Sequence, residues 1–318
     1  MRSRVPSKHR LPIKLLVDAG LLRAGLWRYH KRRGFLSHAD ALPVPLSFME
    51  LIAPGQAPSR RGLPGLLVSK RSEAIEDLSA DWLLLRNRAV LAVDSQSRKV
   101  IRIDSAPYVS TDYEMHRSRF SLHVPSAAFG VLPGRIGIVE SVIEGQTFRA
   151  IEPECRVEAL DQLMTSLENL IAQEGIPEAG RILELVCSTS PIRAVREQSD
   201  AIVDAMGHLP LVPAHADISK ENIVLANDMP VLVDFGNMRL GLPTEDAISL
   251  AGLMGGDVVA NRMHCLERVA TATNVPFNVG KEFGRLAVLA GKALTVWARP
   301  IFPHHLQKKY AKWDRKHS

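Results

Sequence analysis

The sequence predicts an α+β fold with a small β-rich lobe followed by a larger α-rich lobe. Strand-like apolar runs occupy residues 82–104 and 135–148. From about residue 156 the apolar residues recur at helical spacing, and one polar hairpin at 223–235 interrupts the helices. Runs of strands followed by runs of helices are typical of α+β proteins. A chain of 318 residues is long enough for two such lobes.

We expect three segments along the chain. Residues 1–65 are predicted to form a basic helical extension and linker, 66–148 a β-rich N-lobe, and 149–318 an α-helical C-lobe with a basic tail. Leucines along one side of 9–33 indicate an amphipathic helix or a pair of helices. The Pro- and Gly-rich run "APGQAPSRRGLPG" at 53–65 is typical of a linker.

The expected elements follow in order. "DWLLLRNRAVLAVD" and "KVIRID" flank "SQSR" and predict a β-hairpin. "STDYEMHRSRFSLHV" predicts a helix capped by Thr111 or Asp112. "RIGIVESVIEGQTF" predicts a strand, and "VEALDQLMTSLENLIAQ" and "IRAVREQSDAIVDAMG" predict helices. The runs "NIVL" and "PVLVDF" bracket "ANDMP", which contains the residues of a turn.

Composition narrows the class of protein. Hydrophobic residues make up 46% of the chain, so we expect a substantial core. Cys155, Cys187 and Cys265 lie far apart without a CxxC pair, which indicates buried thiols rather than a zinc site or a disulfide framework. Because no apolar run approaches the roughly 18 residues of a membrane span, we expect a cytosolic protein.

The positive charge is concentrated at both ends. Residues 1–40 carry +8 and residues 299–318 carry +5, so the middle of a chain with a net charge of +6 is acidic at −7. Basic ends can attract anionic membrane lipid or nucleic acid. Solvated termini without a partner explain the same pattern, and no nucleic-acid-binding module is recognisable.

The polar hairpin region places three oxygen-bearing side chains at short intervals. Asp217 lies in a loop, Asn222 follows five residues later, and Asp234 ends the next strand-like run. Phosphoryl transfer needs a carboxylate beside the attacking hydroxyl and oxygen ligands for Mg²⁺. A turn at 226–230 would bring the three oxygens to one end of the hairpin. Taken singly, each residue is also compatible with a cap or a turn.

The pattern His-x-Asp-x4-Asn, followed by a strand into Asp-Phe-Gly, resembles the protein-kinase-like fold. It is most similar to the aminoglycoside phosphotransferase and choline kinase branch, in which a small residue such as Ala216 follows the histidine. The resemblance implies a bilobal fold and the use of ATP and Mg²⁺. It implies that Asp217 is the catalytic base, that Asn222 and Asp234 bind the metal, and that His215 holds the loop by hydrogen bonds.

The resemblance extends, more weakly, over residues 80 to 255. It implies that Arg102 replaces the family's phosphate-pairing lysine and that Glu114 orients it, whereas Lys99 points to the opposite sheet face. It also implies that backbone groups of Glu140 and Val142 receive adenine. "LPTEDAISLAGLM" resembles the segment in which an aspartate, here at position 246, starts a helix, and no glycine-rich nucleotide loop is identifiable.

The sequence therefore predicts an ATP- and Mg²⁺-dependent kinase acting on a hydroxyl of a small molecule or glycan. The alternative is a catalytically inactive pseudokinase that acts as a binding or scaffold protein, which the missing lysine and glycine-rich loop would favour. A polycationic aminoglycoside would require a strongly acidic cleft, and choline would require clustered aromatic residues. A sugar or a cell-envelope precursor is the preferred acceptor.

Overall fold

The structure is a computed structural model that describes most of the chain. The described residues are 7–30, 35–41, 63–68, 79–85, 89–104, 127–132, 135–143, 145–174, 179–233, 238–274 and 280–297. They divide into two compact units, a strand unit up to Gln146 and a helical unit from Thr147 onward. This division agrees with the predicted α+β class, a β-rich part followed by an α-helical part.

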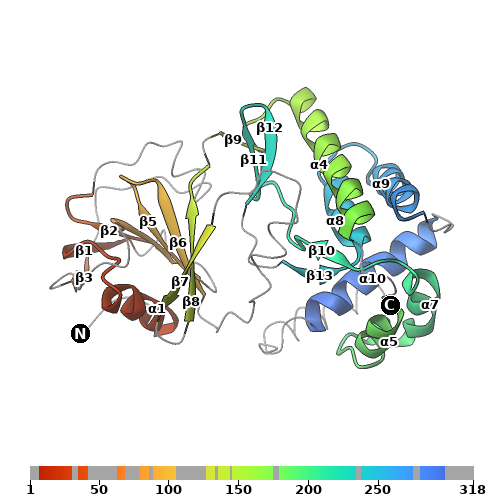
Figure 1. The fold of residues 1–318 in the computed structure, drawn as a ribbon, viewed down its shortest axis with the longest axis horizontal. Coiled ribbons are helices and arrows are strands. Elements are labelled where there is room, and N and C mark those ends of the chain that lie inside the picture. The colour runs from red at the N-terminus through yellow and green to blue at the C-terminus, as the bar shows by residue number, and fades with distance from the viewer. Residues whose placement is uncertain are drawn as a thin grey trace. The chain divides into compact units, whose positions relative to one another are not determined.

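The strand unit is built on one eight-stranded sheet in the order β3-β1-β2-β4-β5-β6-β8-β7, with every neighbouring pair antiparallel (Figure 1). The predicted hairpin is present, because Val93 of β5 pairs with Val100 of β6 across the turn. The strands are β1 (Gly25–His30), β2 (Phe35–His38), β3 (Leu63–Val68), β4 (Trp82–Leu85), β5 (Ala89–Asp94), β6 (Lys99–Asp104), β7 (Ala127–Leu132) and β8 (Arg135–Ser141).

The N-terminal residues differ from the predicted helical extension. Helix α1 (Ser7–Asp18) ends early, and β1, β2 and β3 belong to the same sheet as β4 to β8. Gly20 and Gly25 have φ values of 69° and 131°, a region that favours glycine and ends a helix. Beyond them the burial alternates as in a strand, so the leucine pattern of 9–33 is a helix only in its first half.

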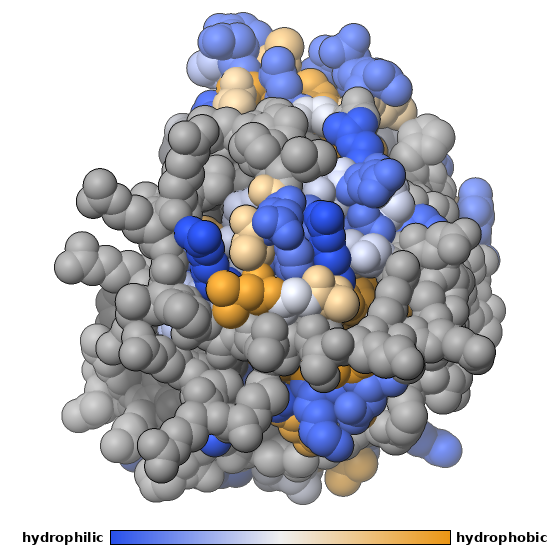
Figure 2. All heavy atoms as spheres, turned by 90° about the vertical axis from the view of Figure 1, so that its left-hand side faces the viewer, coloured by the Kyte–Doolittle hydropathy of each residue, from blue (hydrophilic) through white to orange (hydrophobic). Residues whose placement is uncertain are grey.

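The two faces of the sheet carry different apolar clusters. One cluster joins Leu16 of α1 with Trp27, Ile101 and Ile103, so this helix covers one face. The other cluster gathers Phe35, Trp82, Leu84 and Val93, and Leu91, Val100 and Val142 pack against it. On the face drawn in Figure 2, the described residues show hydrophilic side chains beside small apolar areas.

The helical unit holds the second large core, formed by α5, α7, α10 and their neighbours. Helix α4 buries residues at helical spacing, including Leu160, Leu163, Met164 and Leu167. Asp257 caps the start of helix α9, because its side chain accepts the N–H groups of residues 259 and 260. The helices are α4 (Pro153–Glu174), α5 (Gly180–Ser188), α6 (Arg193–Glu197), α7 (Ser199–Met206), α8 (Pro243–Ala251), α9 (Val258–Thr273) and α10 (Lys281–Trp297).

Two small sheets interrupt these helices. Strands β10 (Val212–Ala214) and β13 (Arg239–Gly241) pair with each other, and β11 (Ile223–Ala226) lies between β12 (Met229–Leu232) and β9 (Gln146–Thr147). The predicted hairpin is present, with Asn227 and Asp228 at φ values of 49° and 62°. Two central residues with positive φ are what a tight two-residue hairpin requires, and Asn and Asp tolerate this conformation.

None of the helices formed by the described residues is long and apolar enough to cross a membrane.

Candidate active site

The loop between β10 and β11 carries the predicted catalytic residue. Asp217 is exposed, whereas His215 is fully buried and Asn222 is 9% exposed. The loop begins after strand β10, which pairs with β13, and it ends at strand β11, which pairs with β12. The sequence therefore folds so that an exposed carboxylate stands between two buried polar residues.

His215 fastens the loop to the end of the β11–β12 hairpin. Its Nε2–H donates to the carbonyl of Val233 at 3.0 Å, and the N–H of Val233 donates to the carbonyl of Asn222 at 3.0 Å. The histidine thus takes the structural role predicted for it. Asp234, a predicted metal ligand, is the next residue along the chain and lies outside the described residues.

Asn222 closes the loop on the side of Asp217. Its side-chain Nδ2 donates to the carbonyl of Asp217 at 2.8 Å, and its own N–H donates to Ser219 at 3.0 Å. Because the amide nitrogen is used as the donor, the Oδ1 oxygen is left as an acceptor. An amide oxygen and carboxylate oxygens are suitable ligands for Mg²⁺, so Asn222 with the carboxylates of Asp217 and Asp234 fits such an ion chemically.

No group of three or more His, Cys, Asp or Glu that could hold a metal occurs in the part of the chain that the structure describes. The predicted set includes an asparagine and Asp234, so this finding does not concern it.

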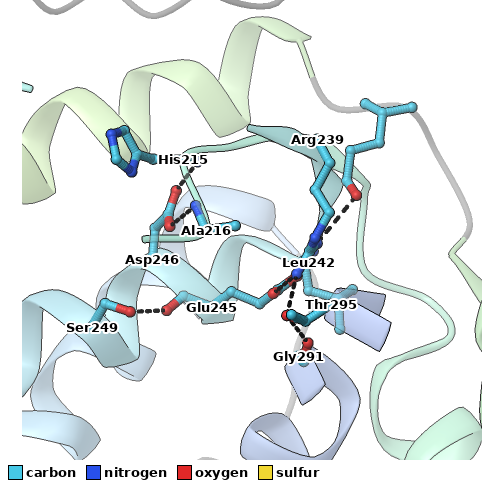
Figure 3. A network of polar contacts seen from close by, with 10 residues as sticks. His215, Ala216, Arg239, Leu242, Glu245, Asp246, Ser249, Gly291 and Thr295 are labelled. Carbon is cyan, nitrogen blue, oxygen red and sulfur yellow. Dashed lines mark hydrogen bonds and ion pairs between the residues drawn. The ribbon is translucent and has the colours of Figure 1, made fainter. Parts of the chain in front are cut away.

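Asp246 holds the same loop from below, in the first turn of α8. Its two carboxylate oxygens accept the N–H of His215 at 2.7 Å and the N–H of Ala216 at 3.0 Å (Figure 3). Burial raises the pKa of Asp246 to about 6, while the two N–H groups and Arg239 act in the opposite direction and Asp217 raises it further. The sequence had marked this residue only as a helix start. Its contact with the loop joins positions about thirty apart, which spacing alone does not reveal.

Ala216 adopts a conformation that is rare for a residue with a side chain. Its φ is 59°, in the left-handed region. The N–H bond to Asp246 holds it there, and the turn it makes directs the chain from buried His215 to exposed Asp217. A small residue at this position therefore has a backbone reason as well as a family resemblance.

Behind Asp246 lies a buried ion pair that the sequence did not indicate. The Arg239 guanidinium donates to both carboxylate oxygens of Glu245, at 3.0 and 2.5 Å, and to Thr295 Oγ1 at 2.9 Å (Figure 3). Glu245 also accepts the N–H of Leu242 at 3.0 Å, so the glutamate side chain satisfies the backbone donor at the start of α8. Pro243 followed by a glutamate two residues later was the available sequence signal for this helix start.

Three of the predicted nucleotide residues, Arg102, Glu140 and Val142, belong to the strand unit, and Arg102 lies in the middle of β6. It pairs with Leu91 on one side and with Ile138 on the other. Since Val100 and Arg102 are two residues apart, they share the sheet face of the Phe35–Trp82 cluster, whereas Ile101 faces α1. Lys99 alternates to the α1 face, as predicted.

The adenine-binding roles predicted for backbone groups of Glu140 and Val142 concern strand β8 and the residue that follows it. Strand β8 has a partner on each side, and Glu140 pairs with Val100 of β6 and with Ala127 of β7. The N–H of Val142 donates to the carbonyl of Arg98 at 2.8 Å, so it is already used within the sheet. Val142 instead contributes its side chain to the apolar cluster on the Arg102 face. Glu114 lies outside the described residues.

A family model matches the part of the chain that contains the predicted catalytic residues. The family described as "Phosphotransferase enzyme family" (APH) matches residues 152–274, which run from the start of α4 to the end of α9. A comparison with curated protein sequences finds no match.

A comparison with solved structures finds matches to several small-molecule kinases. The choline kinase LicA from Streptococcus pneumoniae has a TM-score of 0.49 at 12% identity, over 73% of this chain and 90% of that one. The ADP-bound aminoglycoside phosphotransferase APH(2'')-Ib has a TM-score of 0.45 at 13% identity, over 73% and 90%. APH(3'')-Id from Streptomyces rimosus has a TM-score of 0.43 at 15% identity, over 67% and 92%.

The resemblance predicted from the spacing of His215, Asp217 and Asn222 is confirmed by this match, in which residues 152–274 are similar to the APH phosphotransferase family.

Proposed function

We propose that this chain is an ATP- and Mg²⁺-dependent phosphotransferase that moves the γ-phosphate to a hydroxyl of a small molecule or glycan. The observation that carries the proposal is the fixing of the Asp217 loop. Hydrogen bonds donated by the side chains of His215 and Asn222, and those that the Asp246 carboxylate accepts, hold its two ends and its turn, while Asp217 itself remains exposed. An exposed carboxylate on a fixed loop is what the orientation of an attacking hydroxyl requires.

In the proposed reaction Asp217 accepts a hydrogen bond from the substrate hydroxyl and takes its proton as the new bond forms. The hydroxyl oxygen forms a bond to the γ-phosphorus, the bond from that phosphorus to the β,γ-bridging oxygen breaks, and ADP leaves. Most of the rate enhancement in such transfers comes from positioning and charge stabilisation. The protein groups that fix the loop therefore contribute to the rate together with the carboxylate that they present.

Asn222 and Asp234 are proposed to hold Mg²⁺, which neutralises phosphate charge when it is bound. Asn222 is suited to this role because its buried amide is already oriented by its bond to the carbonyl of Asp217. A ligand that is fixed before the ion arrives loses little conformational freedom on binding it.

Arg102 is proposed to pair with phosphate oxygens, with Glu114 orienting it. A guanidinium remains charged at every physiological pH and binds phosphate through parallel N–H donors. Val100 and Val142 on the same sheet face are proposed to contact the adenine ring through their side chains. Their half-buried apolar surface is suited to a flat base.

We propose a sugar or a cell-envelope glycan precursor as the acceptor. The middle of the chain, between the basic ends, carries only a moderate negative charge, and aromatic residues form only 5% of the sequence. The first observation does not favour a polycationic acceptor, and the second does not favour an aromatic cage for a quaternary amine.

The basic ends are proposed to give the chain weak peripheral contact with anionic membrane. In the described part, α1 exposes Arg10, Leu11 and Lys14 on its outer side, although Lys14 forms an ion pair with Asp18 at 3.2 Å. Sedimentation with vesicles of anionic and of neutral lipid tests this contact. Equal binding to both kinds of vesicle, or binding to neither, would remove it.

The decisive experiment is ATP consumption by the purified full chain against a panel of sugars, amino alcohols and aminoglycosides, with Mg²⁺ and with chelator. We expect Mg²⁺-dependent ADP release that one class of acceptor stimulates, with the transferred phosphate on its hydroxyl. Mg-nucleotide binding without transfer to any acceptor would instead indicate a pseudokinase. Failure to bind nucleotide at all would contradict both the active kinase and a nucleotide-binding pseudokinase.

A further inference from the structure

Arg239 lies beneath the loop that joins β10 to β11 and carries Asp217, called the catalytic loop below. The small β10–β13 sheet connects Arg239 to this loop. It pairs in register with Ala214, the residue that precedes His215. Its side chain is only 11% exposed and that of its partner Glu245 only 8% exposed. The guanidinium also reaches Thr295 of α10, so one side chain connects β13, α8 and α10 (Figure 3).

The space around this pair is filled closely. A Cβ atom on Gly241 would lie 2.5 Å from Glu245 Oε1 and 2.7 Å from Arg239 Nη1, which no ordinary contact allows. A Cβ on Gly291 of α10 would lie 3.0 Å from Glu245 Cγ. Two glycines from different elements therefore leave the room that the pair occupies, and the pair has one defined arrangement.

The pair determines how α8 begins, and α8 carries the loop anchor. Glu245 accepts the N–H of Leu242 with the same Oε1 that receives Arg239. The following residue, Asp246, then directs both carboxylate oxygens to the N–H groups of His215 and Ala216. The positive charge of Arg239 also acts on Asp246, where it opposes the rise in pKa that burial causes.

We propose that Arg239 is a positioning residue for Asp217, acting through Glu245 and Asp246 on the backbone of the catalytic loop. This inference rests on the proposed phosphotransfer only for its kinetic consequence, since the geometry of the loop can be observed without turnover. Loss of Arg239 would leave two neighbouring buried carboxylates without their shared cation. Their mutual repulsion would displace the turn at Ala216, and Asp217 with it.

The test compares Arg239→Met with Arg268→Met in the purified full chain. Arg268 is a matched control because it also forms ion pairs with carboxylates, those of Asp161 and Glu168, but links α4 to α9 away from the loop. We expect Arg239→Met to lower kcat about 10- to 100-fold, as a displacement of about 1 Å can do. KM for ATP should change little, and Arg268→Met should leave kcat near the wild-type value.

Arg239→Lys supplies the conservative comparison. An ammonium keeps the charge but cannot donate to both Glu245 oxygens in parallel and to Thr295 from one planar group. We expect its kcat to lie between those of wild type and Arg239→Met. A wild-type kcat in folded Arg239→Met would overturn the proposal. The proposal would also be overturned if Arg268→Met lost as much kcat as Arg239→Met when the two variants lose the same amount of thermal stability.

Hydrogen exchange of the amides of residues 215 and 216 gives a second readout that does not need turnover. These N–H groups should exchange faster in Arg239→Met and remain protected in Arg268→Met. If Arg239→Met does not fold, Glu245→Gln replaces it, because the amide keeps the size and one acceptor oxygen. Unchanged protection in the folded variant would overturn the proposal. Absence of turnover in the wild type would count against the proposed function alone.

Discussion

Two of the arginine–carboxylate clusters in the helical unit differ in burial and in what they connect. Arg239 and Glu245 are almost fully enclosed, with 11% and 8% of their side chains exposed. Arg268 is 19% exposed, but its partners Asp161 and Glu168 are 64% and 26% exposed. The first cluster lies beneath the catalytic loop, and the second joins α4 and α9 at the surface.

Burial changes how much an ion pair contributes to stability and to geometry. A solvated pair contributes on the order of 0–1 kcal/mol, because water and salt screen it. Removing one partner of a buried pair costs about 3–5 kcal/mol, because the remaining charge is stranded without water. We therefore expect the α4–α9 cluster to support stability modestly. The cluster beneath the loop controls whether α8 presents Asp246 correctly.

The largest loss of kcat is expected from substitution of Asp217, the residue that the buried cluster holds in position. Asp217→Asn should lower kcat about 10²- to 10⁴-fold, because an amide cannot take the proton of the acceptor hydroxyl. Mg-nucleotide binding should remain nearly unchanged, since Asp217 acts at the acceptor. Steady-state turnover and a nucleotide titration measure the two quantities. A variant that keeps more than about half of the wild-type kcat would show that the loop is held in place for some other purpose.

Arg102 lies outside both clusters, and its substitution is expected to have the next largest effect, on the binding of Mg-ATP. Arg102→Met should weaken Mg-ATP binding about 10- to 100-fold, because a charge-assisted bond to phosphate is lost. Arg102→Lys should retain or raise activity, because the site of the family that this strand resembles accommodates an ammonium. Calorimetric titration of ATP into the two variants decides the assignment. Wild-type affinity in Arg102→Met would transfer the phosphate role to another basic residue.

The contribution of Asp246 to stability depends on pH. Burial raises its pKa to about 6, so the folded chain holds this proton more tightly than the unfolded chain does. Its contribution to stability is therefore full below the ordinary carboxyl pKa of about 4 and is lost as the pH rises through about 6. Each unit of difference in pKa corresponds to about 1.4 kcal/mol.

Asp246→Asn should remove this part of the pH dependence and lower kcat about tenfold. The amide retains one acceptor oxygen, but its NH₂ group faces an N–H donor of the loop, so one bond of about 1 kcal/mol or more is lost. Thermal unfolding at several pH values from 4 to 7 and turnover at pH 7 measure the two effects. Arg268→Met should keep the wild-type pH dependence. Identical pH curves for wild type and Asp246→Asn would contradict the role of this carboxyl.

The local parts of the fold could be predicted from the sequence because their causes are local. The β5–β6 and β11–β12 hairpins follow from alternation and from turn residues such as Asn227 and Asp228. The strand β1 was missed because the leucines of 9–33 continue past Gly20, where positive φ ends the helix. Composition does not show where a helical pattern stops when the residues on both sides are apolar.

The candidate site was predictable in part for the same reason. Asp217 and Asn222 lie five residues apart in one loop, so their meeting follows from the spacing. The bond from His215 to Asp246 spans thirty-one residues, and the contact of Arg239 with Thr295 spans fifty-six. Such contacts depend on how α8 and α10 pack, which no short motif encodes.

The smallest expected effect concerns Ala216, at the turn that the buried cluster supports. A residue with a Cβ atom at a φ of 59° is strained by roughly 1–2 kcal/mol relative to glycine. Ala216→Gly removes that strain but gives the unfolded chain more freedom, which offsets about 0.4–1 kcal/mol of the gain. We expect a net stabilisation of about 1 kcal/mol or less, seen as an increase in Tm of about 2–4 °C at most.

The kcat of Ala216→Gly should stay within about twofold of the wild type, because the bonds of Asp246 to the two N–H groups keep the turn in place. Ala216→Val is the matched control, since a β-branched side chain is still less compatible with positive φ and should lower both Tm and kcat. If Ala216→Gly instead lost most of its kcat while gaining stability, the stiffness of the alanine would itself position Asp217. The cluster beneath the loop would then be only one of two restraints on the catalytic carboxylate.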